Sequence, residues 1–291
     1  DLFYAKMGYG QVSRVHAFTL NVTDFPKGDF SSCAAIEDAD VYRAYYNRKA
    51  AERHGLFLRT ETFGELGRII GMPQKKRIGV WREGRLTGAF EYAFVGVSQA
   101  NPFHYELEVR ELLYDAPADL RALLHFVRAQ DDQVQRVRLY TFDPDFTLAL
   151  DSLHAPVEGV NILDEFHTGE TLGYGLMARV LDARGLRRAL GEADFNQATT
   201  EVVFELTDDL HPENSGPLDW VLEKGRLCER AASADAPRLA LSIADFSAFI
   251  CGAVSLGGLW RHARLTTASP DKLVSLDRAF AAPTFECWTI F

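Results

Sequence analysis

Few residues in this chain have the types and spacing that catalysis requires. Residues 96–100 (GVSQA) superficially match the sharp turn that exposes a nucleophilic serine, but Asn101 and Pro102 follow where that turn needs a helix to begin. Residues 173–178 (GYGLMA) fit a loose dinucleotide-binding fingerprint, yet polar residues precede them where a strand is required. The sequence contains no Cys-x-x-Cys or His-Glu-x-x-His pattern. We therefore expect no metal site and regard both glycine motifs as accidental.

The two ends of the chain carry stronger signals. Residues 3–10 (FYAKMGYG) read as the last turn of a helix, broken by glycines before an alternating strand at 15–20. Tyr4 lies in that turn. Residues 285–291 (FECWTIF) end the chain without a polar fringe, and a tail this apolar is expected to dock in a groove rather than fray. The α-carboxylate of Phe291 would then lie in apolar surroundings.

Composition excludes several classes of function. The net charge of −10 argues against a nucleic-acid partner, which needs a basic footprint, and is compatible with a cationic substrate. The four cysteines show no paired spacing and suit a reducing compartment, so we expect a cytoplasmic protein. No apolar run approaches the ~20 residues that a membrane span needs, and we expect no membrane partner.

Hydrophobic periodicity divides the 291 residues into three pieces. Residues 1–24 form a helix end and a strand, too little to fold alone. Residues 25–170 read as α/β and residues 171–291 as α+β. Helices are predicted at 41–50, 118–130, 183–190, 244–256 and 270–280, and strands at 77–82, 86–95, 107–114, 134–142, 174–181, 200–206 and 239–243, with a hairpin at 218–228.

An imperfect anion-binding loop is informative. Residues 68–73 (RIIGMP) resemble the acyl-CoA loop of GNAT acetyltransferases, in which backbone N–H groups at a helix N-terminus hold the pyrophosphate. Here Pro73 removes one donor, and the segment precedes the strand pair instead of following it. Where the loop belongs, after the strand at 107–114, residues 115–119 (DAPAD) add negative charge and no glycine. The middle piece therefore has an acetyltransferase-like layout without a coenzyme A site.

Three segments, in their order, bring a family into view. They are residues 4–10 (YAKMGYG), residues 176–186 (LMARVLDARGL), and the pair 256–258 (LGG) and 276–280 (LDRAF) ahead of the aromatic tail. In this order they resemble the Eis-type (enhanced intracellular survival) N-acetyltransferases. That family has an active GNAT domain, a degenerate second GNAT domain and a sterol-carrier-like C-terminal domain. The resemblance covers nearly the whole chain but lacks most of the first domain.

The resemblance implies a domain organisation and two catalytic roles. Residues 1–24 would be the remnant of the first GNAT domain, 25–170 the degenerate GNAT-like domain and 171–291 the sterol-carrier-like domain. Tyr4 matches the general acid that protonates the departing thiolate of coenzyme A. The terminal carboxylate of Phe291 matches the general base toward the substrate amine. An α-carboxyl titrates near 3.5, so it would need desolvation by neighbours such as Trp288 to act as a base.

The expected function follows. The chain is the C-terminal portion of an acetyl-CoA-dependent acetyltransferase of bacterial type, acting on an aminoglycoside, polyamine or lysine amine. The acetyl-CoA site lies in the missing N-terminal region, and this portion alone is expected to be inactive. We also expect a homo-oligomer. Glu91, Glu106, Glu108 and Glu111 could line a pocket for a cationic substrate, although Glu106 and Glu108, with Glu111, are better explained as a solvated strand face.

A different class of function stays open. Sterol-carrier folds enclose an apolar tunnel, so the last domain could bind a lipid or another apolar ligand without catalysis. The helix at residues 246–254 (FSAFICGAV) is apolar nearly all round, as a tunnel wall or a buried core helix would be, and the core explanation is favoured. A scaffold role, with the degenerate domain mediating oligomer contacts, is a third possibility.

Overall fold

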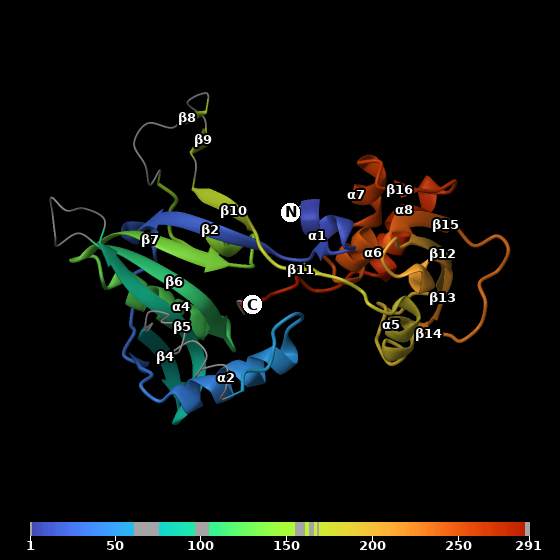
Figure 1. Ribbon diagram of the computed structural model, residues 1–291. Helices are drawn as coiled ribbons and strands as arrows, with labels where there is room; N and C mark the ends of the chain where they lie inside the picture. Colours follow the sequence, from blue (N-terminus) through green and yellow to red (C-terminus); the bar gives the residue numbers. More distant parts are fainter. Residues whose placement is uncertain are drawn as a thin grey trace. The chain divides into compact units, whose positions relative to one another are not determined.

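A computed structural model of the protein (Figure 1) describes residues 2–60, 76–96, 105–154, 161–162, 166–167 and 169–288. Residues 68–73, the serine of residues 96–100, and Phe291 lie outside this part of the chain. Two compact units are present. Unit 1 comprises Asp1–Arg14 and Tyr174–Phe285, and unit 2 comprises Val15–Gly173 and Glu286–Phe291. The domain boundaries at 24/25 and 170/171 stay predictions, because compactness alone defines these units.

Unit 2 is built on one mixed sheet. Its seven strands lie in the order β10-β2-β7-β6-β5-β4-β3; β6 and β7 pair in parallel, and the pairs β2–β7, β3–β4, β4–β5 and β5–β6 are antiparallel. Its elements are β2 (Arg14–Asn21), η1 (Val22–Asp24), β3 (Cys33–Ala35), α2 (Ala39–Glu52), β4 (Lys76–Arg82), β5 (Arg85–Gly96), β6 (Tyr105–Tyr114), α4 (Pro117–Arg128), β7 (Val134–Thr141), η2 (Phe146–Ala149), β8 (Asn161–Ile162), β9 (Phe166–His167) and β10 (Glu170–Tyr174).

Local sequence signals account for most of these elements. Asp38 caps α2 by accepting a hydrogen bond from the Asp40 backbone N–H, as the acids at this position predict. Glu83 and Gly84 both have positive φ (51° and 76°), which gives β4 and β5 the tight turn expected between them. The predicted helices at 41–50 and 118–130 and the strand pair at 77–95 are thus confirmed.

The sheet of unit 2 is covered on both faces. Successive strand residues point to opposite faces, so Ala89 and Phe90 of β5 belong to different cores. Phe90 packs in the core beneath α4, with Leu123 and Val127 of that helix. Ala89 packs in the core beneath α2, with Tyr42 and other tyrosines of that helix. The parallel pair β6 and β7 is connected by α4, which is the crossover that parallel strands require.

Unit 1 contains a second, smaller sheet. Its five strands lie in the order β14-β13-β12-β15-β16, with β12 and β15 parallel, and β1 pairs separately with β11. Its elements are α1 (Leu2–Lys6), β1 (Gly10–Gln11), β11 (Met177–Ala178), α5 (Ala183–Ala189), β12 (Thr200–Thr207), η3 (Pro212–Asn214), β13 (Gly216–Glu223), β14 (Arg226–Leu227), β15 (Arg238–Ser242), α6 (Ile243–Ile250), α7 (Leu256–Arg261), β16 (Leu265–Thr266), η4 (Pro270–Lys272) and α8 (Leu273–Ala279).

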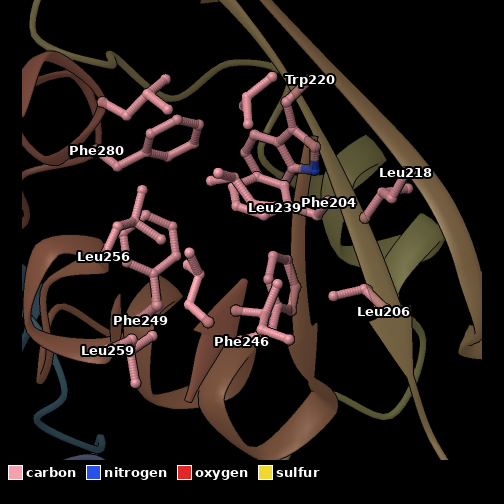
Figure 2. Close-up of a cluster of buried hydrophobic side chains, with 14 of the residues drawn as sticks. Phe204, Leu206, Leu218, Trp220, Leu239, Phe246, Phe249, Leu256, Leu259 and Phe280 are labelled. Carbon is pink, nitrogen blue, oxygen red and sulfur yellow. The ribbon is translucent and has the colours of Figure 1, made fainter. Parts of the chain in front are cut away.

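Aromatic rings fill the core of unit 1. Figure 2 shows Phe204 and Trp220 of the sheet facing Phe246, Phe249 and Phe280 from the helical side. Phe204 lies 5.2 Å from Phe246 and 5.9 Å from Phe280, measured between ring centroids. Phe246 and Phe249 are both buried in this cluster, so the core explanation of the apolar helix is confirmed.

Two predicted elements of unit 1 differ from the structure. The helix predicted at 244–256 ends at Ile250, because Gly252 adopts a φ of +78° and the chain then turns before α7. Of the strand predicted at 174–181, Tyr174 is the last residue of β10, and only Met177 and Ala178 form a second strand, β11, which pairs with β1. That segment pairs with a part of the chain more than 160 residues away, and local alternation contains no information about such a partner.

Candidate active site

Tyr4 lies in the short helix α1, close to the glycines that end it. Its phenol ring is half exposed and contacts Phe3 and Tyr9 edge-on, with centroid distances of 5.3 and 5.9 Å. The Tyr4 carbonyl accepts hydrogen bonds from the backbone N–H groups of Met7 (3.0 Å) and Tyr9 (3.1 Å). The backbone of Tyr4 is therefore fixed by its own turn, while its side chain is half exposed.

Two glycines allow this turn to pack closely against the rest of unit 1. Gly8 has a φ of +79°, which a residue with a side chain rarely adopts. A Cβ on Gly10 would overlap the Ala244 carbonyl and lie 2.8 Å from the amide nitrogen of Ala248, both in α6. The strand that follows is held by a hydrogen bond from Val12 N–H to the Leu176 carbonyl, 3.0 Å. The glycines of residues 3–10 are thus needed for close backbone packing against α6.

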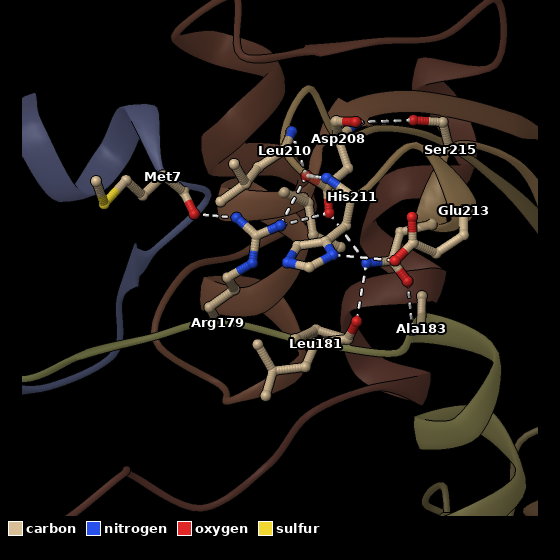
Figure 3. A network of polar contacts seen from close by, with 12 residues as sticks. Met7, Arg179, Leu181, Ala183, Asp208, Leu210, His211, Glu213 and Ser215 are labelled. Atoms are coloured by element: carbon tan, nitrogen blue, oxygen red, sulfur yellow. Dashed lines mark hydrogen bonds and ion pairs between the residues drawn. The ribbon is translucent and has the colours of Figure 1, made fainter.

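A buried ion pair lies beside the same turn (Figure 3). The Arg179 guanidinium donates to the Met7 carbonyl, and its Nη2 lies 2.7 Å from both carboxylate oxygens of Asp208. The side chains of Arg179 and Asp208 are only 3% and 1% exposed. Asn214 donates to Asp208 Oδ2 (3.0 Å) and to the Leu181 carbonyl (3.0 Å). These contacts join α1 to the interior of unit 1.

The environment of Asp208 keeps it charged. Burial alone would raise the pKa of this carboxyl. Hydrogen bonds from Asn214 and from the His211 backbone N–H, together with the Arg179 charge, outweigh burial and hold the pKa below its ordinary value of 3.8. A carboxyl with a depressed pKa stabilises the folded protein at pH values above its unfolded pKa, and this contribution is lost as the pH falls through the folded pKa.

We expect Asp208→Ala to destabilise unit 1 strongly. It leaves the Arg179 charge buried without its partner, which costs about 3 kcal/mol or more. Urea-dependent hydrogen exchange of the β12 amides measures this loss. Glu205→Ala is the control, because its partner Arg238 is 58% exposed, and a surface pair is worth less than about 1 kcal/mol.

The pH dependence of unfolding distinguishes the contribution of the Asp208–Arg179 ion pair from other contributions to the stability of unit 1. The wild type should lose its advantage over Asp208→Ala as the pH falls below 3.8, the ordinary value for this carboxyl. An advantage that persists unchanged below the folded pKa would contradict an electrostatic origin.

The C-terminal tail is anchored within unit 2. The Glu286 backbone N–H donates to the His54 carbonyl (2.9 Å), and the Glu286 carboxylate accepts from Arg53 Nη1 (2.9 Å). The Trp288 ring packs edge-on against Phe142, with centroids 4.6 Å apart. The tail is therefore docked as far as Trp288, as its apolar character predicts. Phe291 itself lies outside the described residues.

Weakening one anchor should loosen the tail measurably. Glu286→Gln removes the charge that pairs with Arg53 but keeps the backbone hydrogen bond to His54. Because both charges are partly exposed, at 24% and 20%, the pair is worth about 0.2–1 kcal/mol. Exchange of the Glu286 amide hydrogen should accelerate by up to about fivefold. The exposed Glu229→Gln should leave that amide unchanged, and equal rates in both variants would contradict the anchor.

The N-terminus of α4 has carboxylates where an anion cradle would need free donors. Asp119 Oδ2 accepts from the Ala116 N–H (3.1 Å), and Asp119 Oδ1 accepts from Arg82 Nε (2.6 Å) and the Thr87 hydroxyl (3.0 Å). Asp115, just before the helix, pairs with Arg48 at 2.9 Å. Asp119 therefore already occupies a backbone N–H that a pyrophosphate would need, and this helix N-terminus is poorly suited to coenzyme A.

The glutamates of unit 2 do not form the solvated face predicted for them. Glu91, Glu106 and Glu111 are buried, at 5%, 7% and 4% exposure. Glu91 pairs with Arg77 (2.8 Å), Glu106 with Arg138 (3.1 Å), Glu108 with Arg110 (2.6 Å) and Glu111 with Arg59 (2.5 Å). The solvated-face prediction is wrong for Glu106 and Glu111. Each charge is balanced by a guanidinium, which also disfavours a pocket for cations at these residues.

The cysteines of the core are poor nucleophiles. Burial raises the pKa of the Cys33 thiol to about 11, with Asp29 adding to the effect, and also raises the pKa of Cys251. The thiolate, which is the reactive form, is therefore suppressed at both positions. Among the described residues no group of three or more His, Cys, Asp or Glu side chains is placed to hold a metal ion.

Sequence reasoning located Tyr4 and the tail but not the residues that hold them. Arg179 occurs in a segment quoted for the family resemblance, yet nothing local marks Asp208 as its partner. Arg53 and Glu286 are 233 positions apart. A basic residue at the end of the α2 segment and an acid in an otherwise apolar tail were the available signals, and neither indicates a pair.

Comparison with solved structures identifies the fold of the whole chain. A GCN5-related N-acetyltransferase from Anabaena variabilis is 15% identical and matches with a TM-score of 0.77 over 100% of this chain and 70% of that chain. A GCN5-related N-acetyltransferase from Kribbella flavida is 18% identical, with a TM-score of 0.70 over 100% and 68%. An Eis protein from Mycobacterium abscessus is 16% identical, with a TM-score of 0.69 over 100% and 71%.

Residues 179–288 match the sterol carrier protein domain family. No curated protein matches the sequence. The chain is therefore a mixed α+β protein with a GNAT-like fold and a sterol-carrier-like domain at 179–288, which confirms the predicted fold class. Within the described part of the chain, no helix has both the length and the apolar character needed to cross a membrane.

Proposed function

We propose that this chain is part of an Eis-like, acetyl-CoA-dependent N-acetyltransferase. The observation that carries the proposal is the agreement of the whole chain with about 70% of the length of N-acetyltransferases, at TM-scores of 0.69 to 0.77. The order of the three quoted segments and the match of residues 179–288 to the sterol carrier family support it further. The preceding part of a longer polypeptide would supply the domain that binds acetyl-CoA.

Two groups of this chain would carry the proton transfers. Acetyl transfer from a thioester requires a neutral amine, whereas alkylamines are mostly protonated at neutral pH. The α-carboxylate of Phe291 would accept the amine proton. The Tyr4 hydroxyl would donate a proton to the sulfur of coenzyme A as the carbon–sulfur bond breaks. The half-exposed phenol of Tyr4 and the tail anchored up to Trp288 support these assignments.

The substrate class follows from the chemistry and the charge. The acceptor would be a primary amine of the aminoglycoside, polyamine or lysine type. A net charge of −10 favours the approach of such cations through the field of the whole protein. We place this activity in a cytoplasmic homo-oligomer.

The chain alone is expected to bind acetyl-CoA weakly or not at all. Asp115 and Asp119 lie at the N-terminus of α4, the helix that connects the parallel strands β6 and β7. Isothermal calorimetry with acetyl-CoA tests this expectation. A dissociation constant in the micromolar range for this chain would contradict it, and heats equal to those of dilution would agree with it.

A carrier function is the alternative, favoured by the match of residues 179–288 to the sterol carrier family. The fully buried Trp220 indole N–H, which lacks an acceptor among the described residues, is a group that an apolar ligand with one oxygen could satisfy. Against it, aromatic side chains already fill this core. Saturable binding of a fluorescent fatty acid by this chain would favour the carrier function, and no binding would favour the enzyme.

An acetylation assay, read together with fatty-acid binding, separates the two functions. The native polypeptide that contains this chain is incubated with acetyl-CoA and spermidine, kanamycin or a lysine peptide, and acetylated product is measured by mass. Product formed at a rate that saturates with the amine supports the acetyltransferase. The absence of product with every amine, combined with saturable fatty-acid binding, would overturn it.

A further inference from the structure

The helix that holds Tyr4 is fixed by a residue 172 positions along the chain. We propose that Arg179 is a positioning residue for Tyr4, acting through the backbone of Met7. This inference rests on the proposed function, because it presumes that the Tyr4 hydroxyl transfers a proton. Arg179 is not proposed to contact either the amine or acetyl-CoA. It would affect the position of Tyr4 through main-chain hydrogen bonds.

The connection between Arg179 and Tyr4 is short and continuous. The Met7 carbonyl accepts from the guanidinium, and the Met7 N–H donates to the Tyr4 carbonyl at 3.0 Å. Figure 3 shows the guanidinium between Met7 on one side and Asp208 on the other. Met7 therefore links the buried ion pair to the backbone of Tyr4, because its carbonyl contacts Arg179 and its N–H contacts the Tyr4 carbonyl. A shift of the guanidinium must move the turn that fixes Tyr4.

Close packing at Gly8 restricts movement between Arg179 and the turn that contains Tyr4. A Cβ at Gly8 would overlap the Arg179 guanidinium and lie 2.8 Å from Cγ2 of Ile243. The guanidinium therefore lies directly on the main chain that follows Met7. Since Gly8 also has a positive φ of 79°, its backbone geometry and its contact with Arg179 both require glycine.

The other side of Arg179 is held rigidly. Asp208 accepts from the backbone N–H groups of Leu210 (3.1 Å) and His211 (3.0 Å) as well as from Asn214. The Arg179 Nε is buried without a hydrogen-bond partner among the described residues. An unsatisfied buried donor costs free energy, so the guanidinium is oriented for its Nη contacts at the expense of Nε. This orientation suits a positioning role better than maximal stability.

A double-mutant cycle tests the inference in the native polypeptide. Arg179→Lys keeps the charge but loses the fork that contacts Met7 and Asp208 together. If Arg179 acts through Tyr4, the variant should lower kcat by about tenfold or more, with the KM for acetyl-CoA unchanged. In the Tyr4→Phe background the same change should lower kcat by less than twofold. Equal factors in both backgrounds would overturn the positioning role.

A second measurement separates this inference from the proposed chemistry. Hydrogen exchange of the Gly8 and Tyr9 amides in the 291-residue chain should accelerate in Arg179→Lys, while the β12 amides keep their protection. Arg230→Lys is the matched control, since Arg230 is 49% exposed and pairs with Glu201 at 2.8 Å. Unchanged exchange at Gly8 and Tyr9 would overturn the inference whatever the chemistry. Accelerated exchange with Tyr4→Phe fully active would instead refute the role of Tyr4 in the proposed function.

Discussion

Tyr4→Phe is expected to lower the kcat of the native polypeptide by about 10²- to 10⁴-fold, the range that general acid–base catalysis contributes. Phenylalanine keeps the edge-on contacts of the ring with Phe3 and Tyr9 and removes only the hydroxyl. Because the ring is 50% exposed, the thermal midpoint should change little. The KM for acetyl-CoA should also change little, since the hydroxyl acts on the sulfur only as it departs.

The control for this variant is a tyrosine of similar exposure with no assigned role. Tyr174 is 66% exposed in β10, and Tyr174→Phe should retain the wild-type kcat. Steady-state kinetics with acetyl-CoA and one amine measure both variants. A kcat for Tyr4→Phe within about threefold of Tyr174→Phe would refute a proton-donor role, because loss of a general acid costs far more.

Displacing the terminal carboxylate should have an effect of the same order. Adding one glycine after Phe291 keeps every side chain and moves the carboxylate by roughly 3.5 Å, the length of one extended residue. A general base must lie within hydrogen-bond reach of its proton, so we expect kcat to fall about 10²-fold or more. Deleting Phe291 should act similarly, and stability should change far less than turnover.

The side chain and the carboxylate of Phe291 can be separated. Phe291→Leu alters the side chain and keeps the carboxylate in place, so it should retain most of the kcat. If the glycine extension is as active as Phe291→Leu, the terminal carboxylate is not the base. If Phe291→Leu is impaired while the glycine extension keeps full activity, the aromatic side chain rather than the carboxylate is required.

Local signals predicted most of the elements, because caps, turns and periodicity are read within a few residues. Asp38 before α2, the Glu83–Gly84 turn and the apolar face of α4 are examples. One failure occurred where a second, distant segment decides the structure. Within residues 175–181 only Met177 and Ala178 form a strand, because their partner is the two-residue segment Gly10–Gln11. The helix predicted to run to residue 256 ends at Ile250, where Gly252 with its positive φ closes a local C-terminal cap that the prediction overlooked.

Long-range pairs of charges were not predictable for a simple reason. The chain has 31 Lys and Arg residues and 41 Asp and Glu residues, so any buried arginine has many possible partners. Only folding brings Asp208 to Arg179 and Glu286 to Arg53. The same limit explains the error at Glu106 and Glu111, because the strand sequence does not show that Arg138 and Arg59 pair with these two buried carboxylates.

Acetyltransferase activity can be measured as the release of coenzyme A by the native polypeptide that contains this chain. The measurement is made with acetyl-CoA, in the presence and absence of a saturating polyamine or aminoglycoside. We expect amine-dependent release with one acetylated amine per coenzyme A, and strong suppression of that release by Tyr4→Phe. Release that is independent of any amine, or none at all from a polypeptide that binds fatty acid instead, would contradict this expectation.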